Sequence, residues 1–278
     1  MKVCVIGTGT MGTGIARLFA TKGDEVAVFS SRPSSVERGI NSITNALNKL
    51  VAKGKMDQES VDTILARIHA GTDEDYASAD LVIESAAERM ELKKELFGKI
   101  DSICPDDCIF ATNTSSLSIT DMSIGLKHQV VGMHFFNPVH AMALVEVIAG
   151  LNTNPETVQW TIEKSLALGK TPVEVKEAPG FVVNRILIPM INEAIFVLAE
   201  GTASASDIDV AMKLGANHPM GPLELSDLIG NDIVLNICEV LHRETGDDKY
   251  RPCPLLRKMV RAGLLGRKSG KGFHEYNK

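Results

Sequence analysis

Three glycines near the start of the chain have the spacing of a phosphate-binding turn. An apolar run at residues 3–6 meets Gly7, Gly9 and Gly12, and helix-forming residues continue to position 19. In a strand-turn-helix context, this G-x-G-x-x-G pattern lets a pyrophosphate approach the backbone where the helix amides and dipole face the anion. We predict dinucleotide binding by this loop, including Thr10 and Met11; the alternative is an ordinary glycine-rich turn.

The next predicted strand ends on Ser30, Ser31 and Arg32 rather than on an acidic residue. An acid about twenty residues after the glycine loop holds the ribose 2′-OH of NAD, whereas it would repel a 2′-phosphate. Two hydroxyls and a guanidinium can bind such a phosphate through charge-assisted hydrogen bonds. The segment therefore favours NADP(H) over NAD(H); the alternative is that Arg32 is a solvated loop residue and NAD binds without its usual anchor.

Glu146 lies within an apolar run, between Val145 and Val147. A carboxylate buried in a strand is costly unless it is paired or hydrogen-bonded. Of all single residues in the sequence, Glu146 most strongly indicates a role in chemistry rather than in structure.

Short apolar segments alternate with helical ones through the first part of the chain. Strands are predicted at 24–30, 79–86, 108–115, 129–136 and 144–149, and helices at 34–55 and 89–101. This alternation predicts a mostly parallel sheet with helices on both faces.

The pattern changes near Pro179 and Gly180. Four long apolar-periodic segments follow, at 186–200, 206–214, 223–244 and 254–263. The prediction is an α/β protein, with a Rossmann-type doubly wound sheet domain over 1–181 and an all-α C-terminal domain over 185–278.

Composition excludes several classes of function. The chain has 278 residues, 44% of them hydrophobic, and a formal net charge of −6, without the basic face that nucleic acid requires. No apolar run is long enough for a membrane span, and no signal peptide is evident. The five cysteines lack the spacing of a zinc site and are expected to be reduced thiols. We expect a cytoplasmic protein with no metal, nucleic-acid or membrane partner.

Four long motifs occur along the chain in the order that is typical of a known protein family. They are ATNTSSLSIT at 111–120, GMHFFNPVHAMALVEVI at 132–148, EAPGFVVNRILIPMINEA at 177–194 and MKLGANHPMGPLELSDLIG at 212–230. With these motifs the chain closely resembles the L-3-hydroxyacyl-CoA dehydrogenase family, most nearly its short-chain bacterial members. The resemblance extends to the closing GLLGRKSGKGFHEY at 263–276.

The resemblance implies a catalytic set. The family's histidine in HFFNP is His134, and its partner carboxylate in LVEVI is Glu146. An imidazole can move the proton at the substrate oxygen, while the carboxylate fixes its tautomer. The family's serine and asparagine fall on Ser115 and Asn184, which would hydrogen-bond the substrate oxygen or thioester carbonyl. The alternatives are a core histidine for His134, a helix cap for Ser115 and a linker contact for Asn184.

The resemblance also implies ligand contacts. It puts Glu88, Lys93 and Asn113 near the ribose and nicotinamide, and the alternative for the first two is a solvated helix face. It puts the pantetheine phosphate of coenzyme A on Lys53, within a basic cluster that includes Lys49. The alternative is structural, because basic residues are favoured near any exposed helix C-terminus. The two interpretations are compatible.

The implied activity is the reversible reduction of acetoacetyl-CoA to (S)-3-hydroxybutyryl-CoA by NAD(P)H, by a homodimer formed through the C-terminal domain. A role in fermentative butyrate synthesis would favour the reductive direction. The alternatives are a 3-hydroxy sugar-acid dehydrogenase on the same scaffold and a dinucleotide-binding protein without turnover.

Overall fold

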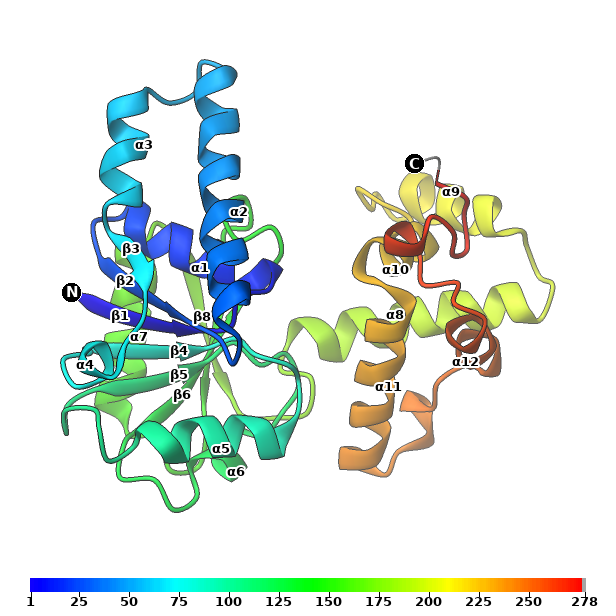
Figure 1. The fold of residues 1–278 in the computed structure, drawn as a ribbon. Coiled ribbons are helices and arrows are strands. Elements are labelled where there is room, and N and C mark those ends of the chain that lie inside the picture. The colour runs from blue at the N-terminus through cyan, green and yellow to red at the C-terminus, as the bar shows by residue number, and fades with distance from the viewer. Residues whose placement is uncertain (277–278) are drawn as a thin grey trace. The chain divides into compact units, whose positions relative to one another are not determined.

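A computed structural model describes residues 1–276 of the chain (Figure 1). The chain divides into two compact units, Met1–Ala178 and Pro179–Lys278. Among the described residues, the strands all belong to the first unit, and the second unit is helical. Within the described residues, no helix is both long and apolar enough to cross a membrane.

The first unit is built on an eight-stranded sheet in the order β3-β2-β1-β4-β5-β6-β7-β8. Strands β1 to β6 are mutually parallel, whereas β7 pairs antiparallel with β6 and parallel with β8. The bounds are Lys2–Ile6, Glu25–Phe29, Ile68–Ala70, Leu81–Glu84, Ile109–Thr112, Val130–Phe135, Leu144–Ala149 and Thr171–Lys176 for β1 to β8.

The order β3-β2-β1-β4-β5-β6 is that of the doubly wound dinucleotide-binding fold, in which ligands bind outside the carboxyl ends of the strands. The central strands are mostly apolar because both faces of a parallel sheet are covered. The predicted fold class, a Rossmann-type domain followed by an all-α domain, is confirmed.

The helices of this unit pack on both faces of the sheet (Figure 1). Helix α1 begins after the glycine loop, and α2 and α3 pack against each other as a pair of helices. Prolines at the first positions of α2 and α7 pre-set the helical φ angle, and Asp57 and Asn154 cap α3 and α7 with their side chains. The bounds are Thr10–Thr21, Pro33–Ala52, Gln58–Leu65, Asp73–Tyr76, Met90–Ile100, Ile119–Ser123 and Pro155–Ala167 for α1 to α7.

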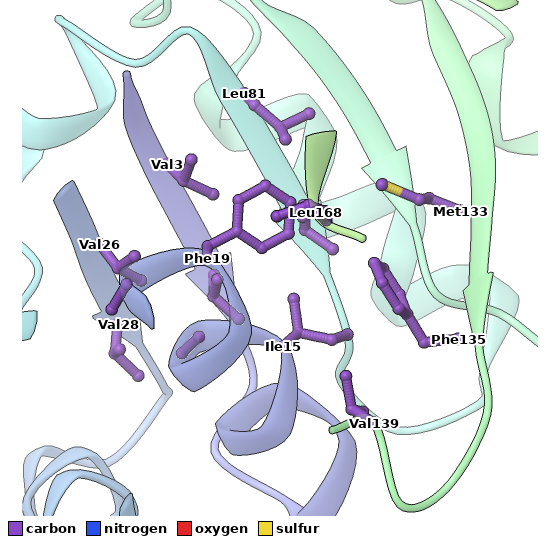
Figure 2. Close-up of a cluster of buried hydrophobic side chains, with 14 of the residues drawn as sticks. Val3, Ile15, Phe19, Val26, Val28, Leu81, Met133, Phe135, Val139 and Leu168 are labelled. Atoms are coloured by element: carbon purple, nitrogen blue, oxygen red, sulfur yellow. The ribbon is translucent and has the colours of Figure 1, made fainter. Parts of the chain in front are cut away.

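An apolar core fixes α1 against the sheet (Figure 2). The ring of Phe19 is fully buried among side chains of the strands and of the residues that follow α7, including Leu168. Met133 and Phe135 of β6 extend the same layer. Each such side chain contributes about 1.5–3 kcal/mol by its burial. This packing fixes the carboxyl ends of β1 and β6 relative to each other.

In the described part of the second unit, helices α8 to α12 pack around a separate core. This core includes Ile188, Ile191 and Ile195 of α8, which are buried against side chains of α11 and α12. Proline opens α10 and α12, and Ser204 caps α9. The bounds are Val183–Ala199, Ala205–Gly215, Pro222–Ile229, Asn231–Thr245 and Pro254–Arg261 for α8 to α12.

The segment 223–244, predicted as one periodic stretch, is instead two helices. Gly230 separates α10 from α11 and has a φ of 108°, which breaks helical geometry and is accessible to glycine. The buried Asn231 stabilises the break, because its side-chain amide donates to Asp227 and to the carbonyl of Leu264. The prediction also placed the start of α8 three residues too late, at 186 rather than Val183.

Candidate active site

The glycine loop has the geometry of a dinucleotide cradle. A Cβ at Gly7 would lie 2.3 Å from the carbonyl oxygen of Ser85, and one at Gly12 only 1.9 Å from that of Gly7. Both positions therefore require glycine for the turn itself. A Cβ at Gly9 would meet nothing within 4 Å, and its φ is −74°. Neither strain nor packing demands glycine there, and the open space beside it would let a ligand approach the backbone.

The start of α1 also fits an anion. Gly9 is the N-cap and offers no side-chain cap, and the first turn, opening with Thr10 and Met11, contains no acidic residue. The amides and positive dipole end of the helix suit a pyrophosphate. The residues present therefore fit a dinucleotide cofactor.

A pocket opens beside the end of β2, next to the predicted ribose-binding segment. Ser30 lines it, whereas Ser31 and Arg32 are exposed at the entrance to α2. Glu37, which sequence reasoning missed, also lines this pocket and brings a carboxylate to it. The rest of the lining is mainly apolar and suits a flat aromatic base; it consists of Val28, Phe29, Pro33, Val36, Ile40, Asn41, Ala70 and Gly71.

His134 and Glu146 form a buried pair. The Nδ1 atom of His134 lies 2.7 Å from Oε2 of Glu146, and the two residues stand directly opposite each other on β6 and β7. His134 is 6% exposed and Glu146 is fully buried. Because a carboxylate only accepts hydrogen bonds, Nδ1 carries the proton and Nε2 is the nitrogen that can exchange one.

Asn113 connects this pair to the neighbouring strands. Its side-chain oxygen accepts from the amide of Phe135, adjacent to His134, and its side-chain nitrogen donates to Ser85. Its own amide donates to the carbonyl of Glu84, at the end of β4. Asn113 thus joins the carboxyl ends of β4, β5 and β6 and holds the backbone next to His134.

Ser115 lies beside Glu88 and is not a helix cap. The carboxylate oxygen Oε1 of Glu88 accepts from the amide of Ser115 at 2.9 Å and from its hydroxyl at 3.2 Å. Thr114 donates to the same oxygen at 2.6 Å. The N-cap of the following helix, α6, is Ser118, so the capping alternative for Ser115 is wrong.

The solvated-helix alternative is also wrong for Lys93. Its side chain is 1% exposed, and its ammonium lies 2.6 Å from Glu84 and 3.3 Å from Glu88. Burial alone would raise the pKa of Glu88, but the Lys93 ammonium and the hydrogen bonds from Thr114 and Ser115 outweigh it and lower the pKa. Glu88 is therefore ionised at neutral pH.

Sequence reasoning missed Glu84, the last residue of β4. It is fully buried behind three apolar residues and is ion-paired with Lys93. The signal that could have found it is the one that identified Glu146, a lone carboxylate at the end of an apolar strand.

The remaining predicted residues lie on two helices, α2 and α8. Lys49 and Lys53 are exposed at the carboxyl end of α2, about 25–30 Å along that helix from Arg32. Asn184 is buried in the first turn of α8, in the second unit.

Known proteins match the chain over nearly its full length. Residues 2–178 match the family model described as 3-hydroxyacyl-CoA dehydrogenase, NAD binding domain, and residues 180–276 match 3-hydroxyacyl-CoA dehydrogenase, C-terminal domain. The 3-hydroxybutyryl-CoA dehydrogenase of Clostridioides difficile is 52% identical over 100% of both chains. The human mitochondrial hydroxyacyl-coenzyme A dehydrogenase is 40% identical over 99% of this chain and 90% of its own. The crystal structure of (S)-3-hydroxybutyryl-CoA dehydrogenase from Ralstonia eutropha has a TM-score of 0.93 and 47% identity, covering 99% of each chain.

Proposed function

The chain belongs to the 3-hydroxyacyl-CoA dehydrogenase family, and from this premise we propose that it catalyses the reversible reduction of acetoacetyl-CoA to (S)-3-hydroxybutyryl-CoA. The observation that carries the proposal is the buried pair of His134 and Glu146. The names of its short-chain relatives support the substrate. When bound, the nicotinamide supplies the hydride that adds to the C3 carbonyl carbon.

His134 supplies the proton in this proposal. During reduction, negative charge would develop on the carbonyl oxygen of the substrate, and Nε2 of the His134 imidazolium would donate its proton to that oxygen. Glu146 holds the proton on Nδ1 and stabilises the imidazolium before the transfer. In the oxidative direction the neutral ring accepts the hydroxyl proton, and the carboxylate stabilises the charge that results.

Ser115 and Asn184 are proposed to contact the substrate. Glu88 fixes the backbone and hydroxyl of Ser115 after β5. A hydroxyl and an amide near the reacting oxygen or the thioester carbonyl would stabilise charge that develops in the transition state. Each such contact contributes a factor of about 10²–10³ to kcat when it is preorganised.

We propose NADP(H) as the preferred cofactor, which fits the reductive direction. The support is the segment Ser30, Ser31 and Arg32 beside the pocket at the end of β2. A second candidate is NAD(H), which is favoured by the carboxylate of Glu37 in the same pocket. A carboxylate can hold a ribose 2′-OH but repels a 2′-phosphate.

Replacing Arg32 with alanine is expected to lower kcat/KM for NADPH by about tenfold or more, because a charge-assisted hydrogen bond to the 2′-phosphate is lost. The value for NADH should stay within about twofold, since NADH has no such phosphate. Both are measured by following acetoacetyl-CoA reduction through the nicotinamide absorbance. Arg38→Ala is the matched control, because Arg38 is an exposed arginine on the same helix that bonds Ser34 and Ser35. Equal losses with both cofactors, or an NADH preference in the parent, would contradict the proposal and point to Glu37.

For coenzyme A we propose a contact at Lys53, with Lys49 nearby. Both ammonium groups are exposed at the end of α2 on a chain of net charge −6. A local positive field on an acidic protein suits a polyanionic ligand.

We further propose that the protein is a homodimer formed through its second unit. The support is that large apolar side chains on the helices of this unit are exposed. Leu214 is 83% exposed, and Val210 one turn earlier on α9 is 44% exposed, while Ile186 on α8 is 69% exposed. Large apolar groups on a helix face mark a contact surface.

Replacing Leu214 with glutamate is expected to convert the dimer to a species near the 30.0 kDa chain mass. A charge placed in an apolar interface has no partner and must be desolvated. Sedimentation equilibrium measures the mass. Leu166→Glu is the control, because Leu166 is 57% exposed on α7 of the first unit. If the parent is itself a monomer, or if only Leu166→Glu dissociates it, the proposal fails.

A further inference from the structure

The carboxylate of Glu84 lies at the carboxyl end of β4 and is fully satisfied although fully buried. Its Oε2 atom accepts from the Lys93 ammonium at 2.6 Å and from the Thr112 hydroxyl at 2.8 Å. Its Oε1 atom accepts from the amide of Ala86. The edge on which it lies is where ligands bind in this fold.

Lys93 links Glu84 to a second carboxylate, that of Glu88. Its ammonium lies between Glu84 at 2.6 Å and Glu88 at 3.3 Å, so one cation is shared by two anions. The other oxygen of Glu88 holds the amide and hydroxyl of Ser115. A continuous chain of charged contacts therefore runs from Glu84 through Lys93 and Glu88 to Ser115.

Stability does not explain why β4 ends on this carboxylate. The other residues of the strand, Leu81, Val82 and Ile83, are apolar and fully buried. A buried ion pair is often no more stabilising than an apolar replacement of similar volume. What the pair does provide is a fixed position for Lys93, and hence for Glu88.

We propose that Glu84 is a positioning residue for the reduction, acting through Lys93 and Glu88 on Ser115. This inference rests on the proposed role of Ser115 in catalysis. Without the negative charge of Glu84, Lys93 would have one anionic partner left and would move toward Glu88. The Glu88 carboxylate would then turn toward the ammonium and loosen its hold on Ser115.

A double-mutant cycle tests the proposal. Acetoacetyl-CoA reduction is measured for the parent, Glu84→Gln, Ser115→Ala and the double variant. Glu84→Gln is expected to lower kcat by about tenfold with KM for acetoacetyl-CoA within about twofold, because a small misplacement of a group that acts in the transition state affects kcat. In the Ser115→Ala background, the same change should cost less than about twofold, since the group it positions is already gone.

Asp101→Asn is the matched control. Asp101 is a carboxylate paired with His128 at the other end of α5, about 12 Å along that helix from Lys93. This variant should lower the melting temperature and leave kcat unchanged. If Glu84→Gln does not fold, Glu84→Asp replaces it, because this change keeps the charge but shortens the side chain by one carbon and so draws the carboxylate away from Lys93; the same loss of kcat, absent in the Ser115→Ala background, is expected.

Two results would overturn the proposal in distinguishable ways. If Glu84→Gln loses the same factor in both backgrounds, Glu84 does not act through Ser115, although the role of Ser115 stands. If Ser115→Ala alone leaves kcat unchanged, the proposed role of Ser115 fails, and the inference about Glu84 fails with it.

Discussion

Replacing His134 with glutamine is expected to lower kcat for acetoacetyl-CoA reduction by about 10³–10⁴-fold. Glutamine can fill much of the buried site and still contact Glu146, but it has no proton to give to the substrate oxygen. KM should change little, because the proton is transferred only in the transition state. Steady-state kinetics with saturating cofactor measure both parameters.

His69→Gln provides the control for this variant. His69 is a half-exposed histidine in the middle of β3, the edge strand of the sheet, and it pairs with Asp75. It should retain parental kcat. Parental activity in His134→Gln, with the melting temperature preserved, would remove His134 from the mechanism.

The second large effect is expected at Glu146. Changing it to glutamine should lower kcat by about 10²–10⁴-fold, because the amide neither stabilises the imidazolium nor enforces the proton on Nδ1. The double variant with His134→Gln should be no slower than His134→Gln alone, since the two residues act as one unit. The same steady-state assay measures the four proteins of the cycle.

Glu174→Gln is the control for Glu146. Glu174 lies on β8, the strand that pairs with β7, but its side chain is exposed. If the factors by which Glu146→Gln and His134→Gln each lower kcat multiply in the double variant, the two residues do not act together.

The sequence was sufficient to predict the sheet where strands are apolar and the loop where glycines are obligatory. Strands β1, β4, β5 and β6 are apolar enough to be found, and Gly7 and Gly12 cannot be replaced without a backbone clash. By contrast, β3 has only three residues, and β8 is a mostly exposed edge strand without a clear apolar pattern. Both strands form through tertiary pairing rather than through local preference.

The candidate site was predictable wherever a long motif fixed a residue. His134 and Glu146 were found in this way, although only the register of β6 with β7 shows that they face each other. Lys93 was harder, because a lysine in a polar helix resembles a solvated residue until the partner nine positions earlier is seen. The serine-rich run at 115–118 could not reveal which serine caps α6.

The relation between Ser115 and Glu88 also depended on three-dimensional structure. Twenty-seven positions separate them, and they meet only because β4 and β5 are neighbours in the sheet. No periodicity in the sequence encodes such a contact.

The most direct test of the central claim compares kcat/KM for acetoacetyl-CoA with kcat/KM for free acetoacetate, using the unmodified protein and its preferred cofactor. The thioester should be preferred by at least about 100-fold, because contacts with the remote coenzyme A portion contribute to reaching the transition state. Equal values, or turnover of the free acid alone, would contradict the assignment of acetoacetyl-CoA as substrate.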